Sequence, residues 1–149
     1  GLYNRRGFCT KYERLLEETG NKALAVIMCD LDGLKYINDN FGHEEGDNAI
    51  HKTACALKAC CPPNAVCTRF GGDEMMAVYP VGENERDVRA LFCEYLDKYN
   101  AVSGKPYTVA ASMGIYIASE GEKPGFEELV KKSDSLMYDE KKRRKALRK

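Results

Sequence analysis

Residues 23–30 read ALAVIMCD, a continuous apolar run that contains β-branched side chains and ends in an acid. Such a run is typical of a central β-strand that is buried on both faces of a sheet. Because the run ends at Asp30, the sequence places a carboxylate at the carboxyl end of this strand. The rest of the fold can be built outward from it.

Apolar residues at helical spacing lie on both sides of this strand. Gly20 ends the first helical segment, Gly42 interrupts the second, and Pro62 terminates the third. The predicted helices in the first half of the chain are residues 8–20, 34–41 and 46–61.

The second half of the chain predicts a hairpin followed by alternating elements. The short runs AVCTRF (65–70) and EMMAVYP (74–80) are separated by two glycines and an aspartate, a composition typical of a tight hairpin. A helix over 83–100, a long strand over 107–119 and a closing helix over 126–145 follow. This order predicts an α+β fold with helices packed on a sheet, and it differs from a doubly wound order.

The composition is that of an ordinary globular chain. Of 149 residues, 44% are hydrophobic, and Lys plus Arg equal Asp plus Glu at 23 each. This balance provides no basic field for nucleic acid, and no apolar stretch approaches the ~18 residues of a membrane span. Seven cysteines without a C-x-x-C pair fit a reducing cytoplasm. We expect one cytoplasmic domain over residues 1–149 that binds no nucleic acid and makes no direct membrane contact.

Two acidic patterns carry candidate chemistry. Asp30 and Asp32 flank Leu31 at the end of the first strand, and Mg²⁺ is commonly held by one or two carboxylates plus substrate phosphates. The alternative is that these acids are turn or helix-cap residues.

The second pattern is RFGGDEM, at residues 69–75, where two glycines precede two acids at the predicted hairpin tip. Glycines permit a close backbone approach or a positive φ, and acids can bind metal. Taken alone, the pattern also fits a plain hairpin. If both acidic patterns converge, they can hold one or two divalent ions, as in enzymes that transfer nucleotidyl groups.

Five ordered motifs together resemble one family: GLYNRRGF, DLDGLKYINDNFGHEEGD, RFGGDEM, SMG and SDSLMYDEK. They are similar to the successive signatures of GGDEF domains, the catalytic domains of diguanylate cyclases, and they cover nearly the whole chain. The resemblance implies a palm-like nucleotidyl cyclase fold with a mainly antiparallel central sheet surrounded by helices. It also implies that two GTP molecules are condensed into cyclic di-GMP with release of two pyrophosphates.

The resemblance further implies a role for individual residues. The metal ligands would be the side chains of Asp30, Asp73 and Glu74 and the carbonyl of Leu31, holding two Mg²⁺, or Mn²⁺, per site. Asp73 and Glu74 would be catalytic, with Asp73 helping to deprotonate the ribose 3′-hydroxyl unless the metal alone suffices. The residues implied at the phosphates are Gly33, Leu34, Lys35, Gly71, Gly72 and Lys141.

The guanine base would be read by Asn38 and Asp47, since a carboxylate can accept hydrogen bonds from both the ring N–H and the exocyclic amino group of guanine. Around Gly42, these two residues could instead be helix caps. Beyond Lys141, Lys145 falls where the family often has an arginine, and the basic run that contains it also fits a solvated helix end.

The implied partners are GTP and a second copy of the domain, because one guanine-reading pair implies one GTP per chain and the product joins two. The family usually carries a sensor upstream, which implies that residues 1–149 were excised from a longer parent that could be membrane-anchored. The alternative function is a catalytically inactive GGDEF domain that binds GTP as a regulatory module.

Two departures from the family pattern carry predictions. Met75 replaces the usual phenylalanine after the acids, and methionine can fill much of the same space. The family's inhibitory product site, R-x-x-D, falls on Pro62 and Ala65, so product inhibition through that site should be absent.

Overall fold

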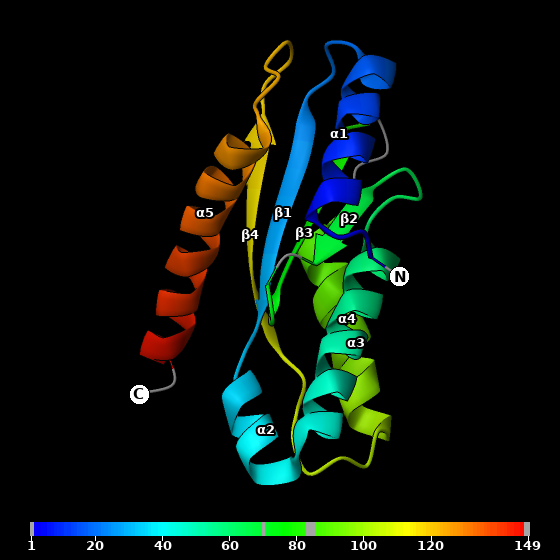
Figure 1. The fold of residues 1–149 in the computed structure, drawn as a ribbon. Coiled ribbons are helices and arrows are strands. Elements are labelled where there is room, and N and C mark those ends of the chain that lie inside the picture. Colours follow the sequence, from blue (N-terminus) through cyan, green and yellow to red (C-terminus); the bar gives the residue numbers. More distant parts are fainter. Residues whose placement is uncertain (1, 70, 83–85, 148–149) are drawn as a thin grey trace.

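The computed structural model describes residues 2–69, 71–82 and 86–147 (Figure 1). The elements follow in the order α1 Arg5–Thr19, β1 Leu24–Leu31, α2 Leu34–Phe41, α3 His43–Cys60, β2 Val66–Arg69, β3 Glu74–Pro80, α4 Val88–Val102, β4 Ala111–Ala118 and α5 Phe126–Leu147.

The four strands form one antiparallel sheet in the order β2-β3-β1-β4. Strand β1 is central, and its residue Asp30 lies opposite Glu74 of β3 on one side and Ser112 of β4 on the other. The sheet confirms the predicted α+β class with an antiparallel core. It also brings the end of β1 beside the start of β3, where the second acidic pattern lies.

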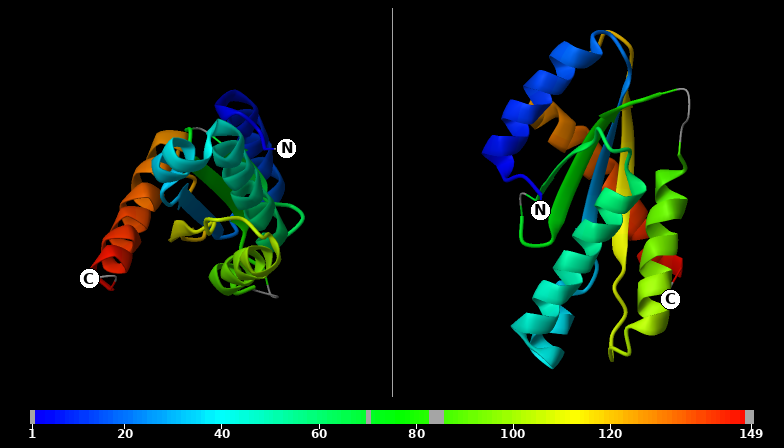
Figure 2. Two further views of the ribbon diagram at one scale, coloured as in Figure 1. Left: turned by 90° about the horizontal axis from the view of Figure 1, so that it is seen from below. Right: turned by 90° about the vertical axis from the view of Figure 1, so that its right-hand side faces the viewer.

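Helices cover both faces of the sheet, and each face has its own core (Figure 2). On one face, Ile27 of β1 lies in a buried cluster with Phe92 of α4 and residues of α3. On the other face, Val26 packs in a cluster with Phe8 of α1 and Leu129 of α5. All eight residues of β1 are buried, as expected for a strand covered on both sides.

Helix α5 lies directly against β4 because Gly114 has no side chain. A Cβ at Gly114 would sit 2.2 Å from the backbone nitrogen of Met137 and 2.7 Å from the carbonyl oxygen of Ser133. Those distances are below any real contact, so only glycine permits this helix-to-strand distance. The close approach brings α5 over the end of β1.

The predicted strand over residues 107–119 begins too early. Strand β4 starts at Ala111, because the side chain of Asn100 bonds both peptide groups of Val109: its amide donates to the Val109 carbonyl at 2.9 Å, and its oxygen accepts from the Val109 N–H at 2.8 Å. Tyr107 is likewise held by α3, where its hydroxyl lies 3.2 Å from the Glu45 carboxylate. These contacts hold Tyr107 and Val109, whereas the carbonyl of Ala110 still accepts from the Asp32 N–H at 2.8 Å.

Other boundaries differ by a few residues. Helix α1 begins at Arg5 because the Asn4 side chain caps it, accepting from the Gly7 N–H at 2.8 Å. Helix α3 begins at His43, three residues earlier than predicted. The predicted start of the fourth helix, at residues 83–85, lies outside the described residues. Over the described part of the chain, no helix combines the length and apolar character needed to cross a membrane.

Candidate active site

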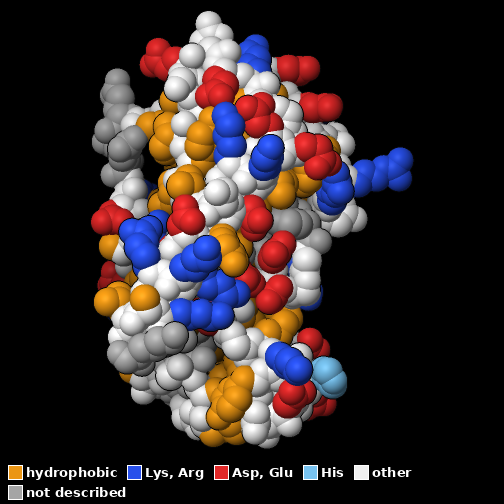
Figure 3. All heavy atoms as spheres, turned by 90° about the vertical axis from the view of Figure 1, so that its left-hand side faces the viewer, with side chains coloured by type: hydrophobic (Ala, Val, Ile, Leu, Met, Phe, Trp, Pro, Cys, Tyr) orange, Lys and Arg blue, Asp and Glu red, His pale blue; other side chains and the backbone are white. Residues whose placement is uncertain are grey.

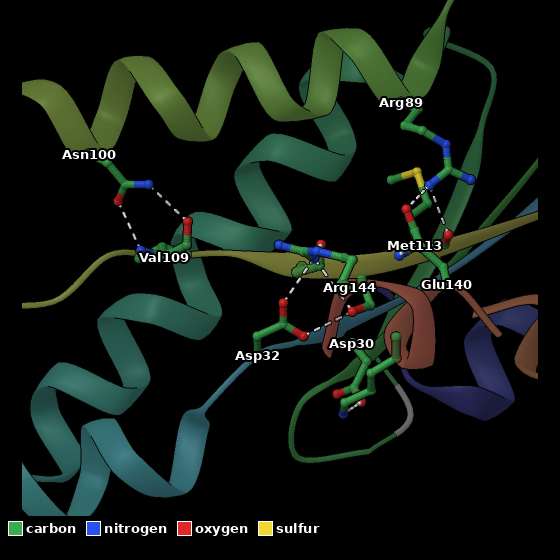
Figure 4. Close-up of polar contacts among 11 residues, drawn as sticks. Asp30, Asp32, Arg89, Asn100, Val109, Met113, Glu140 and Arg144 are labelled. Carbon is green, nitrogen blue, oxygen red and sulfur yellow. Dashed lines mark hydrogen bonds and ion pairs between the residues drawn. The ribbon is translucent and has the colours of Figure 1, made fainter. Parts of the chain in front are cut away.

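Asp30 presents a carboxylate at the end of the central strand (Figure 4). The residue is only 6% exposed. Its Oδ2 accepts from the Lys141 ammonium of α5 at 2.8 Å, whereas its buried Oδ1 has no hydrogen-bond partner among the described residues. A buried carboxylate oxygen without a partner is costly, so this atom is a candidate ligand for a cation.

The hairpin tip is fastened to this strand end by backbone contacts. The N–H of Leu31 donates to the carbonyl of Asp73 at 2.9 Å. The guanidinium of Arg69 donates to the carbonyls of Gly71 at 3.2 Å and Gly72 at 2.9 Å, which fixes the path of the tip. Asp73 and Asp30 are therefore neighbours, as the two acidic patterns predicted.

Gly72 does not adopt a positive φ, so of the two uses of glycine that the sequence allowed, close backbone approach is the one that remains for it. Among the described residues, no atom lies within 4 Å of where a Cβ of Gly72 would sit. At Gly71, the closest atom to that position is the Cβ of Glu74 at 3.3 Å. The absence of a side chain at Gly72 leaves the tip backbone open to close approach by a ligand.

The charges at the site shift one another's pKa. Burial, together with the nearby Asp73 carboxyl, raises the pKa of Asp30 to about 6 against the lowering effect of Lys141. Burial, with Asp134 and Asp73, also raises the pKa of Glu74. The hydrogen bond to Asp30 raises the pKa of Lys141, which therefore keeps its positive charge. Clustered carboxylates with raised pKa values favour the binding of a cation.

A pocket of about 340 Å³ joins these groups on the α5 side of the molecule. Figure 3 shows this face, where Lys and Arg side chains gather next to Asp and Glu side chains. The charged residues that line the pocket are Asp30, Glu74, Asp134, Lys141, Lys142 and Lys145. Acids attract a metal and lysines attract phosphate, so the mixture suits a metal–nucleotide complex better than either ligand alone.

The donors fit Mg²⁺ in kind. Asp30, Asp73 and Glu74 supply carboxylate oxygens, the ligands that Mg²⁺ prefers, and Asp30 Oδ1 lacks a protein partner among the described residues. In the part of the chain that the structure describes, however, no three His, Cys, Asp or Glu side chains are already gathered around one metal position. Because Mg²⁺ commonly takes only one or two protein carboxylates, Asp30 and the nearby Asp73 would suffice, with phosphate oxygens and water completing the coordination.

The start of α2 provides backbone donors on the other side of Asp30. Gly33 adopts a left-handed conformation at φ 70° as the N-cap of α2, and no side chain caps this helix. The N–H groups of the first turn, beginning with Leu34, thus lack a capping side chain, and a helix N-terminus attracts anions. Lys35 is exposed on the same turn. Neither Asp30 nor Asp32 caps this helix, whereas Asp32 does lie in the turn between β1 and α2, as the alternative interpretation allowed.

Asn38 of α2 lies against α3 at Gly46, one residue before Asp47. The Asn38 side chain lies over Gly46, so that a Cβ at Gly46 would sit 1.7 Å from the Asn38 Oδ1. Asp47 is the next residue of α3 and is exposed. The N-caps of α2 and α3 are Gly33 and Gly42, and both guanine candidates lie inside helices. The capping alternative for them is wrong as well.

Sequence reasoning missed the contacts that Asp32 makes with α5. Arg144 pairs with the Asp32 Oδ2 at 2.9 Å, and the Ser112 hydroxyl donates to Asp32 Oδ1 at 3.0 Å. The basic run had indicated a solvated helix end beyond Lys141. Arg144 departs from this expectation, because its guanidinium pairs with Asp32. The sequence did contain a signal for this contact: Arg144 follows Lys141 by three positions and therefore lies on the same face of the helix.

A second pocket, of about 350 Å³, lies between Gly33 and α5. The cations that line it are Lys141, Arg144 and Lys145, and Asp32 and Ser112 complete its wall. The N-cap of α2 and the cations of α5 therefore line one cavity. Of the residues that the family implies at the phosphates, Gly33 and Lys141 thus line the same cavity, while the structure shows no contact that tests Lys35.

Comparisons with known proteins agree with the family that the sequence motifs resemble. The profile of the family described as "Diguanylate cyclase, GGDEF domain" matches residues 1–146. The chain is 30% identical to diguanylate cyclase VdcA of Vibrio cholerae over 95% of its own length and 42% of that protein, and 30% identical to the response regulator PleD of Caulobacter vibrioides over 95% of its length and 32% of that protein. It therefore spans less than half of either relative.

A solved structure has the same fold. A sensory box/GGDEF family protein from Caulobacter crescentus matches with a TM-score of 0.71 and 28% identity, over 95% of this chain and 94% of that one.

Proposed function

This chain belongs to the GGDEF domain family, and we propose that it is a diguanylate cyclase that condenses two GTP into cyclic di-GMP and two pyrophosphates. The observation that carries the proposal is the meeting of Asp30, the Asp73–Glu74 hairpin tip and Lys141 at the end of β1, beside the open first turn of α2. Homology to diguanylate cyclases supports the same reaction class.

The acids of the strand end and the hairpin tip would hold the metal. Asp30, Asp73 and Glu74, with the carbonyl of Leu31, supply oxygen donors for two Mg²⁺ or Mn²⁺. When bound, the metal neutralises charge that develops on the phosphate and lowers the pKa of the attacking hydroxyl. Asp30 must be ionised to bind a cation, and its pKa near 6 leaves it ionised at neutral pH.

The remaining residues would orient the nucleotide. The first-turn amides at Gly33 and Leu34 and the ammonium of Lys141 bind the phosphates, with Lys35 adding charge at the same turn. The open backbone at Gly71 and Gly72 allows the nucleotide to lie against the hairpin.

Specificity for guanine would come from Asn38 and Asp47. ATP lacks the donors that this pair requires, so its binding would leave acceptors unpaired at a cost of roughly 1 to 3 kcal/mol each. GTP is therefore preferred.

Chemistry then requires two copies. Asp73 accepts the proton of the 3′-hydroxyl, which attacks the α-phosphorus of the GTP held by the facing copy, and pyrophosphate leaves. Two such transfers close the ring. Because one chain carries one guanine-reading pair, the complete site consists of two domains related by a two-fold axis.

The test is to incubate the purified domain with Mg²⁺ and GTP and to identify the nucleotides by chromatography and mass. Cyclic di-GMP from the parent but not from Asp73→Ala is the expected result. Binding of GTP without any product, even when dimerisation is enforced by a fused coiled coil, would overturn the enzyme assignment. It would support a regulatory GTP-binding domain instead.

A further inference from the structure

The outer edge of β4 is bonded by side chains of two helices at Met113 (Figure 4). The N–H of Met113 donates to one carboxylate oxygen of Glu140, and the carbonyl of Met113 accepts from the Arg89 guanidinium at 3.0 Å. The other Glu140 oxygen pairs with the same Arg89 nitrogen. These three contacts form a closed ring that joins the N–H and the carbonyl of one edge-strand residue, and we name it the Glu140–Arg89 clamp.

A second contact follows one turn later on α5. The guanidinium of Arg144 donates to the carbonyl of Ala111 at 2.5 Å. Four helical residues rise about 6 Å, and two strand residues advance about 6.7 Å, so the two spacings match. Glu140 and Arg144 thus contact the backbone of two alternate residues of β4, Met113 and Ala111. A helix held at two matched points cannot slide along the strand without losing both contacts.

The register of α5 determines where Lys141 lies. Lys141 directly follows Glu140, and its ammonium reaches across the end of β4 to the Asp30 carboxylate at 2.8 Å. The Glu140 side chain is 19% exposed, whereas that of Glu128, which pairs with Lys132 on the same helix, is 48% exposed. A shielded charge-assisted contact fixes geometry better than an exposed one.

We propose that Glu140 is a positioning residue for catalysis. Together with Arg89, it sets the register of α5 on β4, and this register places the Lys141 ammonium at the triphosphate. Glu140 itself touches no substrate. The inference rests on the proposed function in one respect: that Lys141 binds the phosphates of GTP.

The test compares Glu140→Ala, Lys141→Ala and the double variant for binding of 3′-deoxy-GTP with Mg²⁺, measured by calorimetry. This nucleotide lacks the attacking hydroxyl, so binding is measured without turnover. Glu140→Ala should weaken binding by roughly tenfold, about the effect of one lost charge-assisted hydrogen bond. In the Lys141→Ala background the same substitution should have almost no effect, because its influence acts through Lys141. Additive effects of the two substitutions would overturn the proposal.

Glu128→Gln is the matched control, since it removes the charge of another ion pair on the same helix without approaching Asp30. It should leave the affinity unchanged. Glu140→Gln keeps an acceptor for the Met113 N–H but loses the charge that Arg89 requires, so it should give an intermediate affinity. Affinity as low as that of Glu140→Ala would assign the positioning to the charge pair alone and would support the role of Arg89.

A readout without nucleotide separates this proposal from the proposed function. In Glu140→Ala, amide hydrogen exchange should accelerate at Met113 and at Arg144 and Lys145 of α5. Acceleration at Met113 alone would mean that the clamp does not hold the helix, which contradicts the proposal. If the parent failed to bind 3′-deoxy-GTP, the proposed function would fall, and the exchange data would still decide whether the clamp sets the register of α5.

Discussion

Asp30 combines burial with a raised pKa, and this combination makes stability depend on pH. Because its native pKa of about 6 lies above that of an unfolded aspartate, near 4, the native state binds more protons between these values. The stabilisation from this group is therefore fully present below about pH 4 and is lost as pH rises through about 6.

Replacing Asp30 removes that dependence. In buffer with a chelator, the melting temperature of Asp30→Asn relative to the parent should rise as pH increases from 4 to 7, because only the parent must ionise a buried carboxyl. Thermal unfolding followed by circular dichroism at several pH values measures the difference. Parallel pH curves for the two proteins would show that Asp30 has an ordinary pKa.

Gly46 leaves the space in which the Asn38 side chain lies. Gly46→Ala should displace that side chain and raise the KM for GTP several-fold to about a hundredfold, the range for one or two lost hydrogen bonds. The free energy of unfolding should change by less than about 1 kcal/mol, because alanine is favourable inside a helix. Steady-state kinetics beside a denaturant titration separates the two effects. An unchanged KM would mean that Asn38 does not read the base.

Individual residues differ in how well the sequence could predict them. Asp30, Asp73 and Lys141 stand in sequence motifs whose residue types indicate their chemistry, and the structure brings them together. Glu140 and Arg89 could not be found this way, because their shared partner is the backbone N–H and carbonyl of Met113. A backbone partner leaves no trace in the sequence. The sequence also predicted that Met75 fills much of the space of the family's phenylalanine, and its complete burial agrees with this.

The contact of α5 with β4 depends on Gly114. Gly114→Ala should push the helix away from the strand and lower the free energy of unfolding by about 1 to 3 kcal/mol, the usual cost of overpacking. The same displacement should reduce GTP affinity, since Lys141 is carried by α5. Gly125→Ala is the control, because a Cβ there meets nothing within 4 Å. Equal stability of the two variants would contradict the tight contact.

Helices and strands could be predicted where their apolar period is local. Strand β1 and helix α2 match their predicted residues closely, because each carries a continuous pattern and a clear break. Residues 107–110 look like strand by the same criterion, but Asn100 from α4 takes the peptide groups of Val109. Such a contact between distant segments overrides local preference. The strand order, likewise, depends on pairings that composition does not specify.

The two-copy mechanism predicts how activity depends on concentration. Below the dissociation constant of the dimer, product formation per mole of domain should increase about in proportion to protein concentration, because each turnover needs an encounter of two chains. Fusion to a dimeric coiled coil should remove this dependence. Initial rates over a hundredfold range of concentration, with ultracentrifugation for the oligomeric state, provide the measurement. A constant specific activity in a monomeric sample would contradict the mechanism.

The two outer strands of the sheet also have their peptide groups engaged. On β2, the N–H of Tyr3 donates to the carbonyl of Cys67 at 3.0 Å, and the Arg69 N–H donates to the carbonyl of Tyr3 at 3.1 Å. On β4, Arg89, Glu140 and Arg144 do the same for Ala111 and Met113. A strand from another molecule finds no partners at these positions, and exposed sheet edges are where aggregation begins. At these positions, the sheets of two neighbouring copies therefore cannot join edge to edge.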